Sequence, residues 1–170
     1  RRCGITRLTE TEDMTTVSGY KYAQAAVDSC SKDTLICIWS AIPCTGGSPW
    51  QNMNRRKPGG GEKLQKHFDL FMKLWTKFVL FVEWISKGPR PWRLCIEWPK
   101  GCDYWRWDIV TKVSDKYSLA EVCFDGCAFG LKSRAGGLMK KPWRVCTNDT
   151  NILKNFKPFV CSNTVRLVQM

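Results

Sequence analysis

The clearest pattern in the chain is a stripe of large apolar positions between residues 62 and 86. Apolar side chains recur there at alternating spacings of four and three residues, with lysines on the positions between them. The stripe consists of Leu64, Phe68, Phe71, Trp75, Phe78, Val82 and Ile85. This period is that of one face of an α-helix, and Gly88 and Pro89 end the pattern. We therefore expect a long helix with its apolar face packed in the core.

Short apolar runs rich in strand-forming residues predict a sheet. Three of them, each bounded by polar, proline or glycine positions, indicate buried strands at residues 34–40, 93–97 and 119–124. Near the carboxyl terminus, "CAFGLKS" and "KPWRVCT" flank the basic, glycine-rich stretch "RAGGLMKK", which indicates an antiparallel hairpin. Residues 43–61 contain prolines and glycines and read as a loop.

Weaker helical patterns lie between the predicted strands. They cover residues 23–30, 108–116 and 151–156. Strands that alternate with helices favour a parallel sheet covered by helices. The predicted fold is α/β: a partly parallel, Rossmann-like sheet with flanking helices and a C-terminal antiparallel hairpin. We expect one domain over residues 34–170, preceded by a segment, residues 1–33, whose structure the pattern leaves undefined.

Three chemically distinctive segments follow the three predicted strands. They are "IPCTGG", "EWPKGC" and "FDGCAFG". Ligands of parallel α/β sheets gather at the carboxyl ends of the strands. If the three strands are neighbours, Cys44, Glu97 and Asp125 face one crevice.

Two of these residues suit nucleophilic chemistry. A thiolate at Cys44 is a potent nucleophile when its pKa is lowered, and Glu97 is placed to protonate or hydrogen-bond a ring nitrogen. Together they fit the addition of a cysteine to a pyrimidine base that has left its stack. The alternatives are that Cys44 packs in a tight turn and that Glu97 forms an ion pair with Arg93 or Lys100.

The same segments resemble motifs of the cytosine-type DNA methyltransferases. "IPCTGGSPWQ" resembles the Pro-Cys motif of that family, and "IEWP" resembles its Glu-Asn motif, with Trp98 where asparagine is usual. "FDGCAFGLKS" and "KKPWRVCT" are similar to the later strand pair. The resemblance covers about residues 34–148. This region is most similar to methyltransferase-like segments of mobile-element polyproteins in marine protists.

This resemblance implies Cys44 as the nucleophile, Glu97 as the acid and S-adenosylmethionine as the cofactor. Residues 1–33 contain no glycine-rich loop of the kind that binds this cofactor. The resemblance therefore implies a degenerate or incomplete methyltransferase-like domain that acts on or binds nucleic acid. The alternative is a non-catalytic, basic, tryptophan-rich interaction or structural subunit of a larger assembly.

The charge of the chain favours a polyanionic partner. Its 170 residues include 27 lysines and arginines but only 15 aspartates and glutamates, which gives a net charge of +12. Such a balance favours nucleic acid or an acidic protein surface. The candidate nucleic-acid-binding residues are Arg55, Arg56, Lys132, Arg134, Lys140, Lys141 and Arg144. Those near the hairpin either bind phosphates or are solvated, and the nine tryptophans either stack on bases or fill the core.

The ten cysteines bear on the compartment. Several lie inside apolar runs, where a free cysteine behaves as a small buried hydrophobe. We therefore expect an intracellular, reducing compartment, without a choice between nucleus and organelle; a secreted, disulfide-linked domain is the alternative. The single histidine, His67, and the lack of any Cys-x-x-Cys favour no metal site. The longest apolar segment, residues 68–85, carries four charges, so we expect no transmembrane span.

Overall fold

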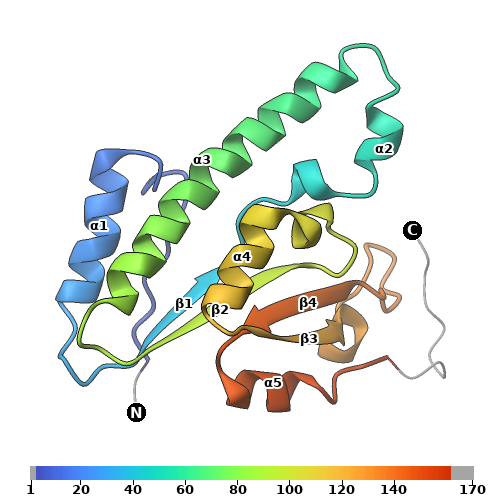
Figure 1. Ribbon diagram of the computed structural model, residues 1–170. Coiled ribbons are helices and arrows are strands. Elements are labelled where there is room, and N and C mark those ends of the chain that lie inside the picture. Colours follow the sequence, from blue (N-terminus) through green and yellow to red (C-terminus); the bar gives the residue numbers. More distant parts are fainter. Residues whose placement is uncertain (1–2, 162–170) are drawn as a thin grey trace.

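A four-stranded mixed sheet forms the centre of this computed structural model, which describes residues 3–161 (Figure 1). The order of strands across the sheet is β1-β2-β4-β3. The strands are β1 (Ile36–Ser40), β2 (Trp92–Pro99), β3 (Ala120–Asp125) and β4 (Pro142–Thr147). Each strand lies at or within three residues of a predicted apolar run, because those runs combine strand propensity with burial.

Three of the four strands run in the same direction. β1 pairs with β2 in parallel, with Trp39 opposite Cys95. β4 is antiparallel to both β2 and β3, so β3 points the same way as β1 and β2. The predicted α/β fold with a partly parallel sheet is thus confirmed. The carboxyl ends of β1, β2 and β3 share one edge, which we call the carboxyl edge.

The predicted hairpin is present, but its first strand differs from the prediction. β4 pairs with β3 and not with residues 127–133, which contain a 3-10 turn (Gly126–Phe129) and a single bridge between Lys132 and Leu138. Gly126 lies so close to the Leu131 side chain that an added Cβ would be 2.7 Å from it, and Gly130 has a φ of +76°. This close turn and left-handed residue bend the chain out of the extended conformation.

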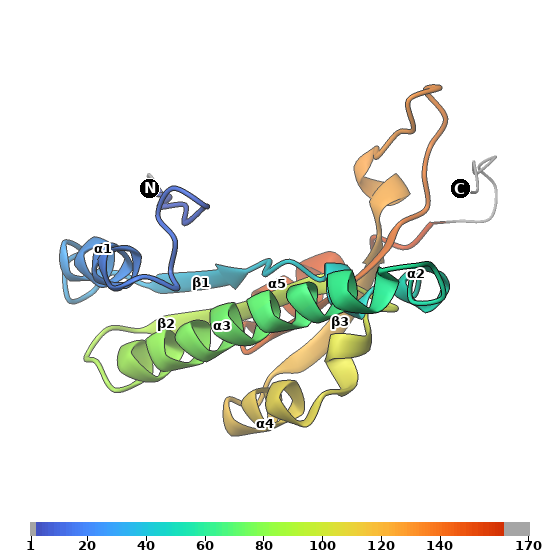
Figure 2. The same cartoon turned by 90° about the horizontal axis from the view of Figure 1, so that it is seen from above.

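Helices cover both faces of the sheet (Figures 1 and 2). They are α1 (Val17–Asp28), α2 (Gln51–Asn54), α3 (Gly60–Ser86), α4 (Asp108–Lys116) and α5 (Thr150–Phe156). The main core packs α3 and α4 against Leu94 and Ile96 of β2, whereas Cys95, between them, packs under α5. This alternation follows from the two-residue period of a strand. The predicted apolar stripe of α3 provides most of its buried side chains.

Helix α1 is longer than the predicted helix at 23–30. Thr16 caps its amino end, since its hydroxyl accepts a hydrogen bond from the Gly19 N–H at 3.0 Å. The helix packs Ala23 against Phe81 and Ile85 of α3. Residues 17–28 are therefore part of the same packed structure as the sheet.

The cysteines are mostly free thiols. One disulfide joins Cys127, in the turn after β3, to Cys161. The other eight cysteines are free, and Cys95, Cys102 and Cys146 are buried. Burial of these thiols agrees with their positions in apolar runs.

Candidate functional site

Cys44 lies in a tight turn at the carboxyl edge, four residues after β1. It precedes the 3-10 turn Thr45–Gly47, and its carbonyl accepts a hydrogen bond from the Gly47 N–H at 3.0 Å. The side chain is half-buried and packs against the main core under α3 and α4. The thiol therefore sits in a tight turn and remains partly exposed, and its role as a nucleophile stays a prediction.

The two glycines after Cys44 allow the turn to pack closely. A Cβ added to Gly46 would lie 2.3 Å from the Tyr104 hydroxyl, and one added to Gly47 would lie 2.8 Å from the Cys102 sulfur. Any side chain at these positions would collide with buried neighbours. The glycines thus serve packing, and side chains already fill the space beside them.

Trp98 fixes the same turn to β2. Its side chain is fully buried, and its indole N–H donates a hydrogen bond to the carbonyl of Ile42 at 2.7 Å. This tryptophan therefore holds the segment that carries Cys44. Sequence reasoning identifies this residue only as a departure from the motif.

The pKa of the Cys44 thiol is lowered to about 7, chiefly because the thiol of Cys102 donates a hydrogen bond to it. Partial burial opposes the shift, the charge of Lys141 supports it, and the charge of Glu97 opposes it. The pKa of Cys102 is raised by the same contact. The shift favours the thiolate form of Cys44, which is the reactive form of a cysteine.

Glu97 points to the other face of the sheet. It lies between Ile96 and Trp98, which pack in the main core, so its side chain projects toward the side of α5. Its Oε2 accepts a hydrogen bond from the indole N–H of Trp39 at 2.7 Å. The suggested ion pair with Arg93 is not formed, since that guanidinium lies 3.7 Å from Asp149.

Asp125 serves as an anchor for the carboxyl-terminal segment. β4 separates β3 from β2, so Asp125 is not on a strand next to those of Cys44 and Glu97. Its buried carboxylate accepts the Cys161 N–H at 3.0 Å and lies 3.9 Å from the Lys140 ammonium. The expected single crevice of Cys44, Glu97 and Asp125 is therefore not formed, because Glu97 projects from the other face of the sheet and Asp125 is engaged by Cys161.

Two basic loops, residues 55–57 and 132–134, lie beyond the end of the sheet toward which β1 and β3 run (Figures 1 and 2). The first loop joins α2 to α3, and the second lies between β3 and β4. Their charged side chains are all exposed: Arg55, Arg56, Lys57, Lys132 and Arg134. We refer to these two segments as the basic loops.

The candidate basic residues of β4 and its amino-terminal side have internal partners. The guanidinium of Arg144 lies 3.1 Å from Glu121 and 5.4 Å from the ring centre of Trp105. The ammonium of Lys141 lies 4.3 Å from the ring centre of Trp143. Arg144 thus contributes to packing on β4. Lys141 is exposed, and its positive charge lowers the pKa of the Cys44 thiol.

The tryptophans divide between packing and exposure. Trp75, Trp98 and Trp105 are buried, and Trp50 and Trp39 are 61% and 43% exposed. Most of the others are half-buried and contact further aromatic rings. Most of the tryptophans therefore fill the core. Trp50 is exposed and lies five residues before Arg55 of the first basic loop.

Cys102 is the residue of this site that sequence reasoning misses. The sequence pattern assigns it no role, whereas in the fold its thiol lies beside Cys44 and lowers the pKa of that thiol. One signal is present: Cys37 and Cys44 are separated by the same number of residues as Cys95 and Cys102. Because β1 and β2 are parallel, this equal spacing gives Cys44 and Cys102 the same offset along the two segments as Cys37 and Cys95.

Comparisons with known proteins assign no relative to the chain. No protein-family model matches it, and no curated protein or solved structure shows significant similarity. Within residues 3–161 there is no group of three or more His, Cys, Asp or Glu side chains suited to hold a metal ion. None of the described helices is both long enough and apolar enough to cross a membrane.

Proposed function

We propose that the chain is a methyltransferase-like domain that binds nucleic acid at the carboxyl edge, with Cys44 as a nucleophile toward a pyrimidine base. The observation that carries this proposal is a half-buried thiol in the turn after β1, with two exposed basic loops beyond the same edge of the sheet. The lowered pKa of this thiol supports its reactivity. Thiolate character and phosphate-binding charge are the two properties that such a reaction requires.

The order of elements supports the resemblance to cytosine-type methyltransferases. The Pro-Cys segment follows β1, the "IEWP" segment lies in the next parallel strand, and the strand pair β3–β4 follows. The resemblance implies a Rossmann-like sheet in which these segments meet at the carboxyl ends of the strands. The fold alone does not define an activity, so the proposal rests on the thiol and on the charges around it.

In the proposed reaction the Cys44 sulfur adds to a ring carbon of a flipped pyrimidine. The new sulfur–carbon bond pushes electrons toward a ring nitrogen, which takes a proton from an acid. Glu97 is our candidate for that acid. Its side chain projects from the opposite face of β2 and is held by the indole N–H of Trp39, so this role requires Glu97 both to release that contact and to turn around the carboxyl edge toward Cys44.

The described residues do not fit S-adenosylmethionine. The turn with adjacent glycines after β1 has its free space filled by Tyr104 and Cys102. Residues 3–16 precede α1 without a strand and have no glycine-rich loop. We therefore derive no methyl-transfer step for this chain, and we expect calorimetric titration with S-adenosylmethionine to show no specific binding.

The test uses an oligonucleotide that carries 5-azacytosine, a base that forms stable adducts with thiolates. We expect a covalent complex with the unmodified chain and none with Cys44→Ser. Cys37→Ser is the matched control, because Cys37 also has a pKa of about 7 but lies on the sheet face away from the main core. An adduct that persists in Cys44→Ser would refute the role of Cys44.

A non-catalytic binding domain is the second candidate. It is favoured by the contact of Glu97 with Trp39 and by the packed glycines after Cys44. Here the basic loops bind nucleic acid or an acidic protein surface as part of a larger complex. Binding without any covalent adduct, weakened by changes in the basic loops, would support this candidate over the first.

A further inference from the structure

A second pair of thiols lies on β1 and β2, away from Cys44. Cys37 is exposed on β1, an edge strand that pairs only with β2 in the described part of the chain. The register places Cys37 opposite Arg93, and Cys95 is two residues further along the same face. Cys95 is completely buried. An exposed thiol and a buried thiol are therefore diagonal neighbours on adjacent strands.

The two side chains project from the same face of the sheet, two positions apart along adjacent strands. The neighbouring Cys95 thiol lowers the pKa of Cys37 to about 7 in spite of partial burial. The neighbouring Cys37 thiol and burial raise the pKa of Cys95. The accessible sulfur is thus the more acidic of the two thiols.

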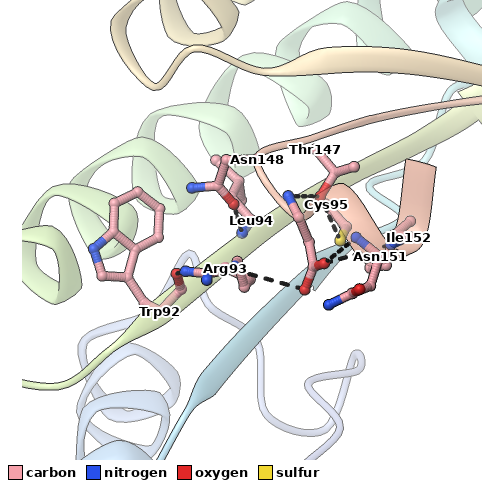
Figure 3. A network of polar contacts seen from close by, with 9 residues as sticks. Trp92, Arg93, Leu94, Cys95, Thr147, Asn148, Asn151 and Ile152 are labelled. Atoms are coloured by element: carbon pink, nitrogen blue, oxygen red, sulfur yellow. Dashed lines mark hydrogen bonds and ion pairs between the residues drawn. The ribbon is translucent and has the colours of Figure 1, made fainter. Parts of the chain in front are cut away.

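A network of polar contacts holds Cys95 in place (Figure 3). Its sulfur lies 3.3 Å from the Thr147 hydroxyl, which also accepts the Asp149 N–H at 3.0 Å. Asp149 in turn caps α5, since its carboxylate accepts the Asn151 N–H at 2.8 Å. The buried sulfur is therefore fixed next to Cys37 by contacts that do not involve Cys37.

We propose that Cys37 is a site of reversible oxidation by hydroperoxides, with Cys95 as its resolving thiol. The Cys37 thiolate attacks one peroxide oxygen, the O–O bond breaks, and Cys37 becomes a sulfenic acid while the peroxide leaves as water or an alcohol. The Cys95 sulfur then attacks the Cys37 sulfur and releases water, forming a disulfide across β1 and β2. Because the register sets the two residues on a diagonal, this step requires the edge strand β1 to shift relative to β2. Two thiols are oxidised and one hydroperoxide is reduced.

This pair fits the requirements of a redox site better than the other cysteines. Cys3 is also exposed, but no second thiol contacts it in residues 3–161. Cys146 is buried, and burial raises its pKa to about 12. Cys44 has a low pKa and a thiol partner, but its side chain is half-buried, so Cys37 is the more accessible of the two. The proposal is independent of any nucleic-acid activity.

The test treats the reduced full chain with one equivalent of hydrogen peroxide at pH 7, followed by digestion without reduction and mass spectrometry. We expect a peptide pair that joins Cys37 to Cys95 and disappears after treatment with a thiol reductant. Cys3 serves as the control, and it should be oxidised at least tenfold more slowly than Cys37. Equal oxidation of Cys3 and Cys37, without the linked peptide, would overturn the proposal.

A variant separates the two steps of the reaction. In Cys95→Ala we expect the sulfenic acid on Cys37 to persist and to be labelled by dimedone, whereas the unmodified chain shows little label. The melting temperature of the variant shows whether it is folded. If the variant and the unmodified chain carry the same dimedone label on Cys37, Cys95 is not the resolving thiol and the proposal fails.

Discussion

The indole N–H of Trp98 donates a hydrogen bond to the carbonyl of Ile42 and so joins β2 to the turn that carries Cys44. Both ends of this contact lie against the main core, and Cys102 and Tyr104 pack beside them. The position of the Cys44 sulfur therefore depends on a buried side chain of another strand. Two quantities can be measured separately: the contribution of Trp98 to the stability of the fold and the reactivity of the Cys44 thiol.

Trp98→Phe should destabilise the fold and disturb Cys44. Loss of the hydrogen bond leaves the Ile42 carbonyl without its partner, which costs about 1–3 kcal/mol of unfolding free energy. Urea unfolding measures the destabilisation, and mass spectrometry after alkylation at pH 7 measures the Cys44 rate. The matched control is Trp105→Phe, whose indole N–H donates to the Pro99 carbonyl at 3.0 Å instead. If both variants change the Cys44 rate equally, the hydrogen bond to Ile42 does not position the thiol.

The alkylation rate of Cys44 should depend on pH with a midpoint of about 7. The rate falls below this pH, because the thiolate is the reactive form and protonation removes it. Cys102→Ala removes the donated hydrogen bond, so the pKa of Cys44 rises and the rate at pH 7 falls. Lys141→Met should also raise this pKa, whereas Glu97→Gln should lower it. Shifts of the same sign in the last two variants would contradict the electrostatic account.

The basic loops should account for the salt dependence of nucleic-acid binding. Lys132→Ala with Arg134→Ala removes two exposed cations, and the slope of log K against log salt should fall by about 1 for each phosphate that is no longer neutralised. The control is Lys32→Ala with Lys87→Ala, two exposed lysines that respectively precede β1 and β2. Equal slopes in the two double variants would show that only total charge matters.

Gly46→Ala should destabilise the turn of Cys44. Its Cβ would lie 2.3 Å from the Tyr104 hydroxyl, and relief of such overpacking costs about 1–3 kcal/mol. Gly61→Ala is the control, because no atom lies within 4 Å of its Cβ and the residue is in α3. There alanine should stabilise the fold by about 0.5–1 kcal/mol through its helix propensity. Thermal or urea unfolding should show a lower unfolding free energy for Gly46→Ala and a higher one for Gly61→Ala, each relative to the unmodified chain.

The disulfide should stabilise the carboxyl-terminal segment. Cys127 and Cys161 are 34 residues apart, and closing a loop of this length is worth about 3–4 kcal/mol in the chain-entropy account. Thiol titration of the denatured chain should find eight free thiols before reduction and ten after it. A reductant should lower the urea midpoint of the unmodified chain but not that of Cys127→Ala.

Much of the fold is predictable because local patterns and tertiary contacts agree. The stripe of α3 predicts residues 62–86, and the helix spans Gly60–Ser86. The strand β1 follows from its apolar run in the same way. The predicted hairpin partner is wrong because the choice between residues 120–125 and 127–133 depends on a close turn at Gly126, which the apolar pattern does not encode.

The site is predictable only in part. The position of Cys44 at a strand end follows from the chain order, but its contact with Cys102 depends on how two loops pack after β1 and β2. The Trp39 contact of Glu97 depends on which face of β2 is turned to α5. The sequence predicts only a loop over residues 43–61, and the close packing of Gly46 and Gly47 against Tyr104 and Cys102 depends on tertiary contacts.

The placement of β4 has a consequence for synthesis on the ribosome. Among the described strands, β3 joins the sheet through β4, and β4 is the last of the four to be made. Until residue 147 has left the exit tunnel, β2 therefore exposes one unpaired edge and β3 has no strand partner. We expect the nascent chain to remain sensitive to proteases until β4 has emerged, and then to become protected in one cooperative step.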